Sequence, residues 1–307
     1  MHAHYFDRAY VDLLESLGVD SRIIPDARRA VSAAPDNGIG ERLDVMDRSQ
    51  VERQMLSMSA VTPYFDDVAA AVRGAQFLND QHAELCRTHP ERFGFFATLP
   101  MPHVDASLAE IRRAFDDLHA GGVTFTTSIR SRPLADPAFA AIFAELDRRA
   151  AVVFLHPAGF ACESPMIEAS GLGWPLGAPV EDAVCAMQLV RGGFPARYPH
   201  LKVIIPHLGG FLPFLRYRLD KAGPRRPAGE KPSTLLRKFW YDTANGEPAS
   251  LRHAVDVYGA DRILFGSDYP YWADESYDHA VHYLELAGLG EPELAAIRNG
   301  NARALLA

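Results

Sequence analysis

The chain has 307 residues, of which 48% are hydrophobic and 23% are charged, and its formal net charge at pH 7 is -8. This composition is ordinary for a globular protein with a large core. The acidic balance argues against nucleic acid and anionic membrane surfaces as partners. No apolar run approaches the ~20 residues of a membrane-spanning helix, and residues 1–10 lack the basic and apolar regions of a signal peptide.

Three cysteines occur, Cys86, Cys162 and Cys185. Their number is odd, and no two of them form a C-x-x-C pair. This pattern indicates reduced thiols in a cytoplasmic protein rather than a disulfide framework.

The chain opens on a His-Ala-His motif, which a long polar segment follows. Two histidines at i and i+2, His2 and His4, project to the same face if this piece is extended. Residues 7–50 are rich in proline, glycine and arginine, and we expect them to form a long irregular insertion. Such insertions in compact domains are usually functional or mobile.

From residue 51 onwards, short apolar runs alternate with helical patterns. The runs predict seven strands, at residues 55–61, 93–99, 123–128, 151–155, 203–205, 239–242 and 262–265. The helical patterns predict helices at residues 66–89, 106–120, 136–149, 180–191, 214–219, 250–258, 276–287 and 291–306. Two long loops, at residues 158–180 and 223–232, interrupt the alternation.

This alternation of short apolar strands and helices is typical of a parallel sheet that helices cover. With the His2–His4 piece as a short or truncated first strand, the strands number eight. We therefore predict an α/β fold of the (β/α)8 TIM-barrel type, formed by a single domain over residues 1–307. Its long loops at the C-terminal face would set specificity.

Potential metal ligands follow three of the predicted strands. His156 follows AVVFL, His207 comes just after VII, and Asp268 comes just after RILFG. With His2 and His4 they make five nitrogen or oxygen donors at one rim of a barrel, a set that suits zinc and less exclusively iron, manganese or nickel. Each has an ordinary explanation, such as a turn aspartate that bonds its own backbone, but their coincidence at strand ends favours a site.

Several motifs resemble the amidohydrolase superfamily, and most of all its branch of 2-amino-3-carboxymuconate 6-semialdehyde decarboxylase and related metal-dependent decarboxylases. The resemblance covers the chain from about residue 42 to its end, together with the first four residues. The motifs are HAH at 2–4, FLHP at 154–157, PHLGGFLPF at 206–214, GSDYPY at 266–271, RFGFFATLPM at 92–101 and GWPLGAP at 173–179.

The resemblance implies one divalent metal, most often zinc, with manganese, iron or nickel as alternatives. Its ligands would be His2, His4, His156 and Asp268. The catalytic residues would be His207, beside the metal, and Asp268, as both ligand and proton acceptor.

The resemblance also implies a homodimer that acts on a small acidic organic substrate. Arg218 would bind a substrate carboxylate in the site of the neighbouring subunit, and Trp174 would lie near the substrate pocket. Residues 7–41 do not match the family pattern, so its second carboxylate-binding arginine stays open among Arg28, Arg29 and Arg42.

The function that we expect is a metal-dependent carboxy-lyase, a non-oxidative decarboxylase of a small unsaturated or aromatic carboxylic acid. One alternative is a metal-dependent hydrolase of a lactone, amide or C–C bond on the same scaffold. Another is a barrel that binds without catalysis, which the short first strand would favour. Fold alone cannot separate these functions.

Overall fold

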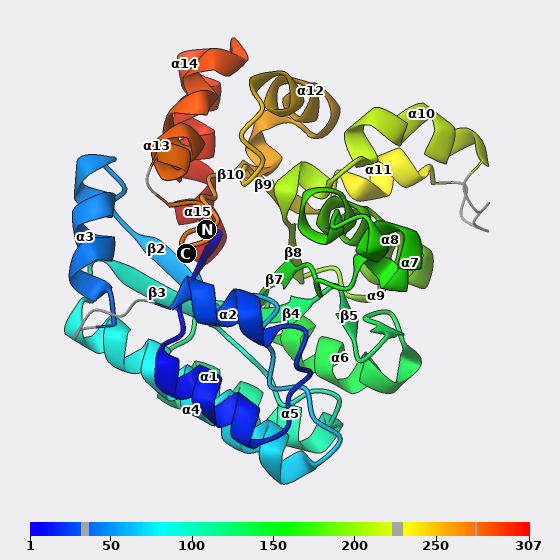
Figure 1. The fold of residues 1–307 in the computed structure, drawn as a ribbon. Coiled ribbons are helices and arrows are strands. Elements are labelled where there is room, and N and C mark those ends of the chain that lie inside the picture. Colours follow the sequence, from blue (N-terminus) through cyan, green and yellow to red (C-terminus); the bar gives the residue numbers. More distant parts are fainter. Residues whose placement is uncertain (32–36, 223–229, 274) are drawn as a thin grey trace.

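The computed structural model describes residues 1–31, 37–222, 230–273 and 275–307. Its centre is a curled, eight-stranded sheet in which all neighbouring strands run parallel (Figure 1). The strands follow one another in space as in the sequence: β1 (Ala3–His4), β2 (Gln54–Ser57), β3 (Phe93–Ala97), β4 (Gly122–Thr126), β7 (Val152–His156), β8 (Lys202–Ile205), β9 (Trp240–Asp242) and β10 (Ile263–Leu264). The predicted α/β fold with eight parallel strands is confirmed.

The two ends of the strand order meet. Ala3 of β1 forms a parallel bridge with Tyr269, which lies just beyond β10. The N–H of His4 donates to the carbonyl of Tyr269 over 2.7 Å, and the N–H of Asp268 donates to the carbonyl of His2 over 2.9 Å. The first few residues of the chain are therefore bonded to a segment more than 260 positions later.

Apolar side chains cover both faces of the sheet. On the inner face, the rings of Phe96 and Phe154 stack with centroids 5.7 Å apart, and Ile204 and Leu264 belong to the same buried cluster. The alternate residues of these strands, such as Val153, pack in the main core with the helices. Because both faces are buried, the strands appear in the sequence as continuous apolar runs.

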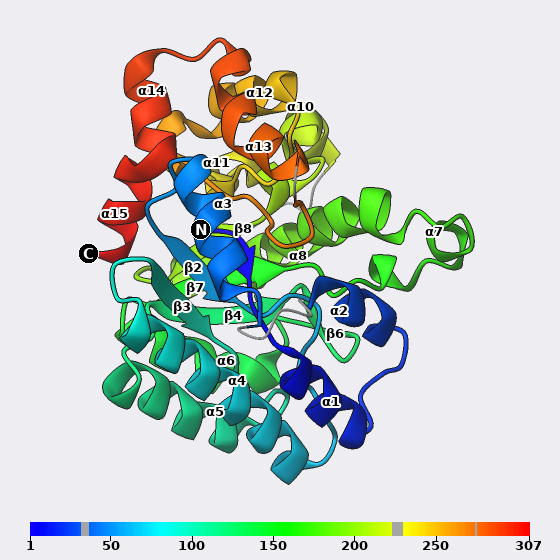
Figure 2. The same cartoon turned by 60° about the vertical axis from the view of Figure 1, so that its left-hand side comes forward.

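Helices connect the strands and surround the sheet (Figures 1 and 2). The main connecting helices are α4 (Val68–Thr88), α5 (Val104–Arg112), α6 (Ala140–Arg148), α8 (Ala178–Gly192), α10 (Leu212–Ala222) and α12 (Pro248–Tyr258). The chain closes with α13 (Glu275–His282), α14 (Glu291–Ala295) and α15 (Asn301–Leu306). In the described residues, no helix is both long and apolar enough to cross a membrane.

The prediction of an irregular segment over residues 7–50 is wrong for the described residues. They form α1 (Arg8–Ser16), α2 (Ile24–Ala30) and α3 (Ile39–Arg48). Prolines and glycines had indicated loops, but Pro25 lies in the first turn of α2, where proline is well tolerated, and Gly38 is the left-handed residue just before α3. Residues 32–36 lie outside the described part.

The two predicted loops also contain helices. Residues 158–180 include α7 (Pro165–Ala169) and a helical turn at Gly173–Gly177. In the second loop, residues 223–229 lie outside the described residues, and α11 (Pro232–Leu236) begins at its end. Helix α2 passes in front of the sheet in Figure 1 and lies to its right in Figure 2, so this N-terminal helix covers one end of the sheet.

Candidate metal centre and active site

Four of the side chains predicted from strand ends meet at one point. His2, His4, His156 and Asp268 each offer a ligand atom, and these atoms all lie within 4.8 Å of one another. The Nε2 atoms of His2 and His4 are 3.0 Å apart, and Asp268 Oδ1 lies 3.3 Å from the first and 3.2 Å from the second. All three histidines are buried.

Bonds at the opposite ring nitrogens turn the three imidazoles toward this point. The Nδ1 atoms of His2, His4 and His156 lie 2.9 Å from Asp242 Oδ2, 3.1 Å from the Met58 carbonyl and 2.9 Å from the Pro157 carbonyl, respectively. These oxygens only accept, so Nδ1 carries the proton. In a neutral ring, Nε2 then presents its lone pair, the arrangement that metal-binding histidines share.

These residues fit a divalent cation. Asp268 Oδ1 is buried and has no hydrogen-bond partner among the described residues, although native structures rarely leave such an oxygen unsatisfied. Burial lowers the pKa of His4 and lowers that of His156 well below its ordinary value. Burial would lower the pKa of His2 as well, but the charges of Asp242 and Asp268 outweigh it and raise that pKa to about 10. The carboxylates therefore attract positive charge to a cluster of otherwise neutral rings.

His207 lies beside the cluster, and its ring centroid is 5.1 Å from that of His2. Its backbone N–H donates to Asp242 Oδ1 over 3.0 Å, and its ring Nδ1 lies 2.8 Å from Asp182 Oδ2. His207 and Asp268 have φ angles of 52° and 59°. This left-handed conformation is uncommon for residues other than glycine and occurs preferentially at functional sites.

Two aromatic rings border the cluster. Trp174 and Tyr271 lie nearly parallel, with ring centroids 6.4 Å apart, and the centroid of Trp174 is 6.3 Å from that of His156. The indole Nε1–H donates to Asp26 Oδ2 of α2 over 2.7 Å. Trp174 therefore lies beside His156, and its bond to Asp26 joins it to helix α2 of the N-terminal segment.

The arginines named from the sequence lie in different places. Arg218 is exposed on α10. Arg42 is buried and donates to the His4 carbonyl over 2.5 Å, so it supports β1. Arg28 pairs on the surface with Asp12 and Glu15.

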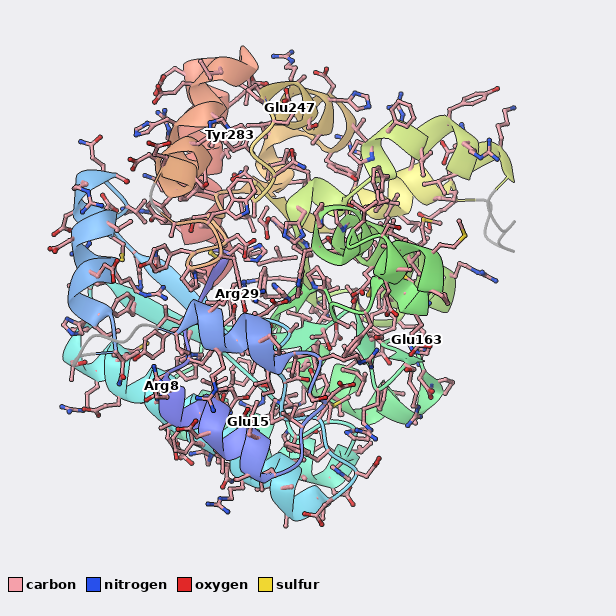
Figure 3. All side chains as sticks on the ribbon, in the orientation of Figure 1. Arg8, Glu15, Arg29, Glu163, Glu247 and Tyr283 are labelled. Carbon is pink, nitrogen blue, oxygen red and sulfur yellow. The ribbon has the colours of Figure 1, made fainter. Side chains whose placement is uncertain are left out.

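Arg29, which pairs with Asp26, lies on α2 near the centre of the view in Figure 3. Arg8 and Glu15 lie on α1, further out. Asp26 also accepts the indole N–H of Trp174. Of the three open candidates, Arg29 is therefore the one that Asp26 joins to the aromatic border of the site.

Sequence reasoning missed the carboxylates that support the histidines. Asp242 is the last residue of β9, so the strand-end rule that found His156 could have found it. Glu181 and Asp182 are consecutive in α8, and a helical sequence pattern does not show which residues such side chains bond. Glu181 accepts the N–H groups of Gly159 and Phe160, over 3.2 and 2.7 Å, and so holds the loop that follows His156.

Comparisons with known proteins show the family of this chain. The family model described as Amidohydrolase matches residues 1–307, so the chain belongs to the amidohydrolase family. The resemblance seen in the sequence motifs is confirmed.

Two characterised relatives are decarboxylases. The chain is 30% identical over 237 residues to 2-amino-3-carboxymuconate-6-semialdehyde decarboxylase of Dictyostelium discoideum. The match covers 75% of this chain and 66% of the relative. It is 32% identical over 270 residues to 6-methylsalicylic acid decarboxylase of Penicillium expansum, and the match covers 84% of this chain and 83% of the relative.

A similar solved structure is that of a dihydroxybenzoic acid decarboxylase from a Polaromonas species, with bound manganese and the inhibitor 2-nitroresorcinol. It has 27% identity to this chain and a TM-score of 0.84, and the match covers 99% of this chain and 95% of that one.

Proposed function

We propose that this protein is a metal-dependent, non-oxidative decarboxylase of a small aromatic or unsaturated carboxylic acid. The observation that carries the proposal is the buried convergence of three imidazole Nε2 atoms and Asp268 Oδ1, with His207 beside them. The decarboxylase names of the relatives support this reaction over hydrolysis.

His2, His4, His156 and Asp268 would hold the cation. Zinc suits three nitrogens and one carboxylate oxygen, and the manganese in the related structure makes manganese the next candidate. When bound, the cation draws negative charge from the substrate oxygens and holds the acid in place.

His207 would deliver the proton that the reaction needs. Its Nδ1–H is bonded to Asp182, so the proton that the substrate receives is the one on Nε2 of the doubly protonated ring, which is left as the neutral Nδ1–H form. The proton adds to the carbon that bears the carboxylate. The bond to the carboxylate carbon then breaks, its electron pair restores the double bond, and carbon dioxide leaves. Asp268 is proposed to serve as ligand and as proton acceptor.

The pocket beside the cluster suits a flat acidic substrate. Trp174, Tyr271 and Phe160 line it together with Arg22, whose guanidinium carbon lies 4.4 Å from the centre of the Phe160 ring. Aromatic faces bind conjugated rings by stacking, and the proposed cation would attract a carboxylate. We therefore propose a small aromatic or conjugated carboxylate as the substrate.

A homodimer would complete the pocket. The exposed side of α10 carries Phe214 and Tyr217, which are 83% and 75% exposed, next to Arg218. Exposed apolar surface of this kind marks an interaction site. We propose that a second copy covers it and receives Arg218 in its own pocket.

We propose a single (β/α)8 barrel over residues 1–307, with a short first strand and long loops around the site. The three cysteines are free thiols, which supports the proposed cytoplasmic location.

The test combines elemental analysis of the purified protein with a substrate screen. 6-Methylsalicylate, 2,6-dihydroxybenzoate and 2-amino-3-carboxymuconate semialdehyde are incubated with metal-loaded and chelator-treated protein, and carbon dioxide is measured. We expect metal-dependent release from at least one of them. Water-dependent cleavage of lactones without carbon dioxide would show a hydrolase, and a protein that keeps no metal and is indifferent to chelator would be a binding barrel.

A further inference from the structure

A buried carboxylate of α8 is aimed at His207. Asp182 has no exposed surface, and its Oδ2 lies 2.8 Å from His207 Nδ1. Its other oxygen, Oδ1, is buried and has no hydrogen-bond partner among the described residues. Burying a carboxylate with so few partners is costly, so stability alone does not explain why an acid stands here.

The neighbouring acid provides a comparison within the same helix. Glu181 is also buried, and it accepts the N–H groups of Gly159 and Phe160 and the hydroxyl of Thr127. Glu181 therefore stabilises the loop after His156. Asp182, one residue later, instead bonds the ring of the residue proposed to transfer a proton.

The backbone around His207 is held in a fixed relation to α8. Gly210 has a φ of +60°, and a Cβ atom there would lie 2.0 Å from the carbonyl oxygen of Pro179. Glycine therefore lets the turn at residues 207–210 pack directly on the first turn of α8, three residues before Asp182. On the other side, Asp242 Oδ1 accepts the backbone N–H of His207.

We propose that Asp182 is a positioning residue for catalysis, which accepts the Nδ1–H of His207 and so fixes the ring and leaves Nε2 for the substrate. A carboxylate behind an imidazole sets its tautomer and orientation and stabilises its charged form. Burial raises the pKa of Asp182 to about 6, although the charge of His207 opposes this. The inference rests on the proposed function, because that function assigns the proton transfer to His207.

The kinetic test uses Asp182→Ala and Asp182→Glu in the zinc-loaded protein. For Asp182→Ala, we expect kcat to fall on the order of 100-fold, as when an orienting carboxylate is lost, while KM and zinc content stay within about twofold. The glutamate variant should recover part of the loss. Asp147→Asn is the matched control, because Asp147 bonds the backbone of His200 and Leu201 just before the other end of β8; its kcat should not change.

A second readout does not depend on activity. Nitrogen-15 NMR of histidine-labelled, zinc-loaded protein reports which ring nitrogen carries the proton, and His207→Gln identifies the signals of His207. We expect Nδ1 to stay protonated in the natural protein, in the imidazolium form at low pH and as the Nδ1–H tautomer once Nε2 has lost its proton, and we expect a mixture of tautomers in Asp182→Ala. If Asp182→Ala does not fold, the same measurements are made on Asp182→Asn, and the tautomer of His207 in the natural protein tests the inference independently.

Two results would overturn the inference: an Nε2–H tautomer in the natural protein, or a normal kcat in Asp182→Ala with the zinc in place. A natural protein that releases no carbon dioxide, but keeps His207 as the Nδ1–H tautomer until Asp182 is replaced, would contradict the proposed function and support the pairing.

Discussion

The carboxylate of Asp242 accepts the Nδ1–H of His2 over 2.9 Å and thereby joins the end of β9 to the beginning of the chain. Its second oxygen accepts the backbone N–H of His207, so one side chain orients a proposed ligand and places the proposed proton donor. Burial would raise the pKa of Asp242, but the charge and hydrogen bond of His2 hold it below its ordinary value. The carboxylate is therefore ionised at neutral pH.

Replacing this carboxylate should weaken metal binding. We expect Asp242→Asn to lower metal affinity about 10- to 100-fold, because outer-shell partners fix the orientation and basicity of ligand imidazoles. Competition with a coloured chelator measures the affinity. Asp256→Asn, at an exposed carboxylate of α12, is the control, and an Asp242→Asn protein with unchanged affinity would contradict this role.

Removal of the His207 ring should separate turnover from metal binding. His207→Ala is expected to keep one metal per chain and to lose about 10²- to 10⁴-fold in kcat, the range that a positioned acid or base contributes. Metal analysis and carbon dioxide release are measured on the same preparation, with the exposed His200→Ala as control. A loss of metal together with activity would make His207 a ligand.

Metal removal should destabilise the fold. A cation that binds only the folded chain adds about 2.7 kcal/mol when its free concentration is 100 times its Kd, which is about 4 °C in Tm for a chain of this size. Thermal unfolding with and without chelator measures the difference. Asp268→Ala should unfold at the lower temperature under both conditions, and a chelator effect of normal size in that variant would remove Asp268 from the ligand set.

Arg218 should act across the proposed dimer interface. We expect Arg218→Ala to raise KM for acidic substrates about tenfold, because it removes one charge-assisted contact with the carboxylate. Arg216→Ala, exposed on the same helix, is the control. Mixed dimers of Arg218→Ala and His207→Ala subunits should regain the natural KM, since the one pocket that keeps His207 then also receives an intact Arg218. Mixed dimers that keep the raised KM of Arg218→Ala would place Arg218 outside the partner's pocket.

The strands and the residues that follow them were predictable, because burial on both faces leaves continuous apolar runs and the ends of parallel strands share one rim. His156 and Asp268 were found in this way. Helices α2 and α3 are not predicted from the sequence, because Pro25 and Gly38 indicate loops, whereas in the structure they lie where these helices begin. Asp242 ends β9, so the same strand-end rule could have found it. Asp182 lies within a helix and acts on His207, 25 positions later, and such a partner becomes visible only in three dimensions.

The proposed ligands come from both ends of the chain, at residues 2 and 268, and are brought together by the bridge between Ala3 and Tyr269. A nascent chain that ends before residue 268 therefore cannot bring the four proposed ligands together. Uptake of the cation would therefore follow the pairing of β1 with the segment after β10, and in a refolding experiment it would report on closure of the sheet.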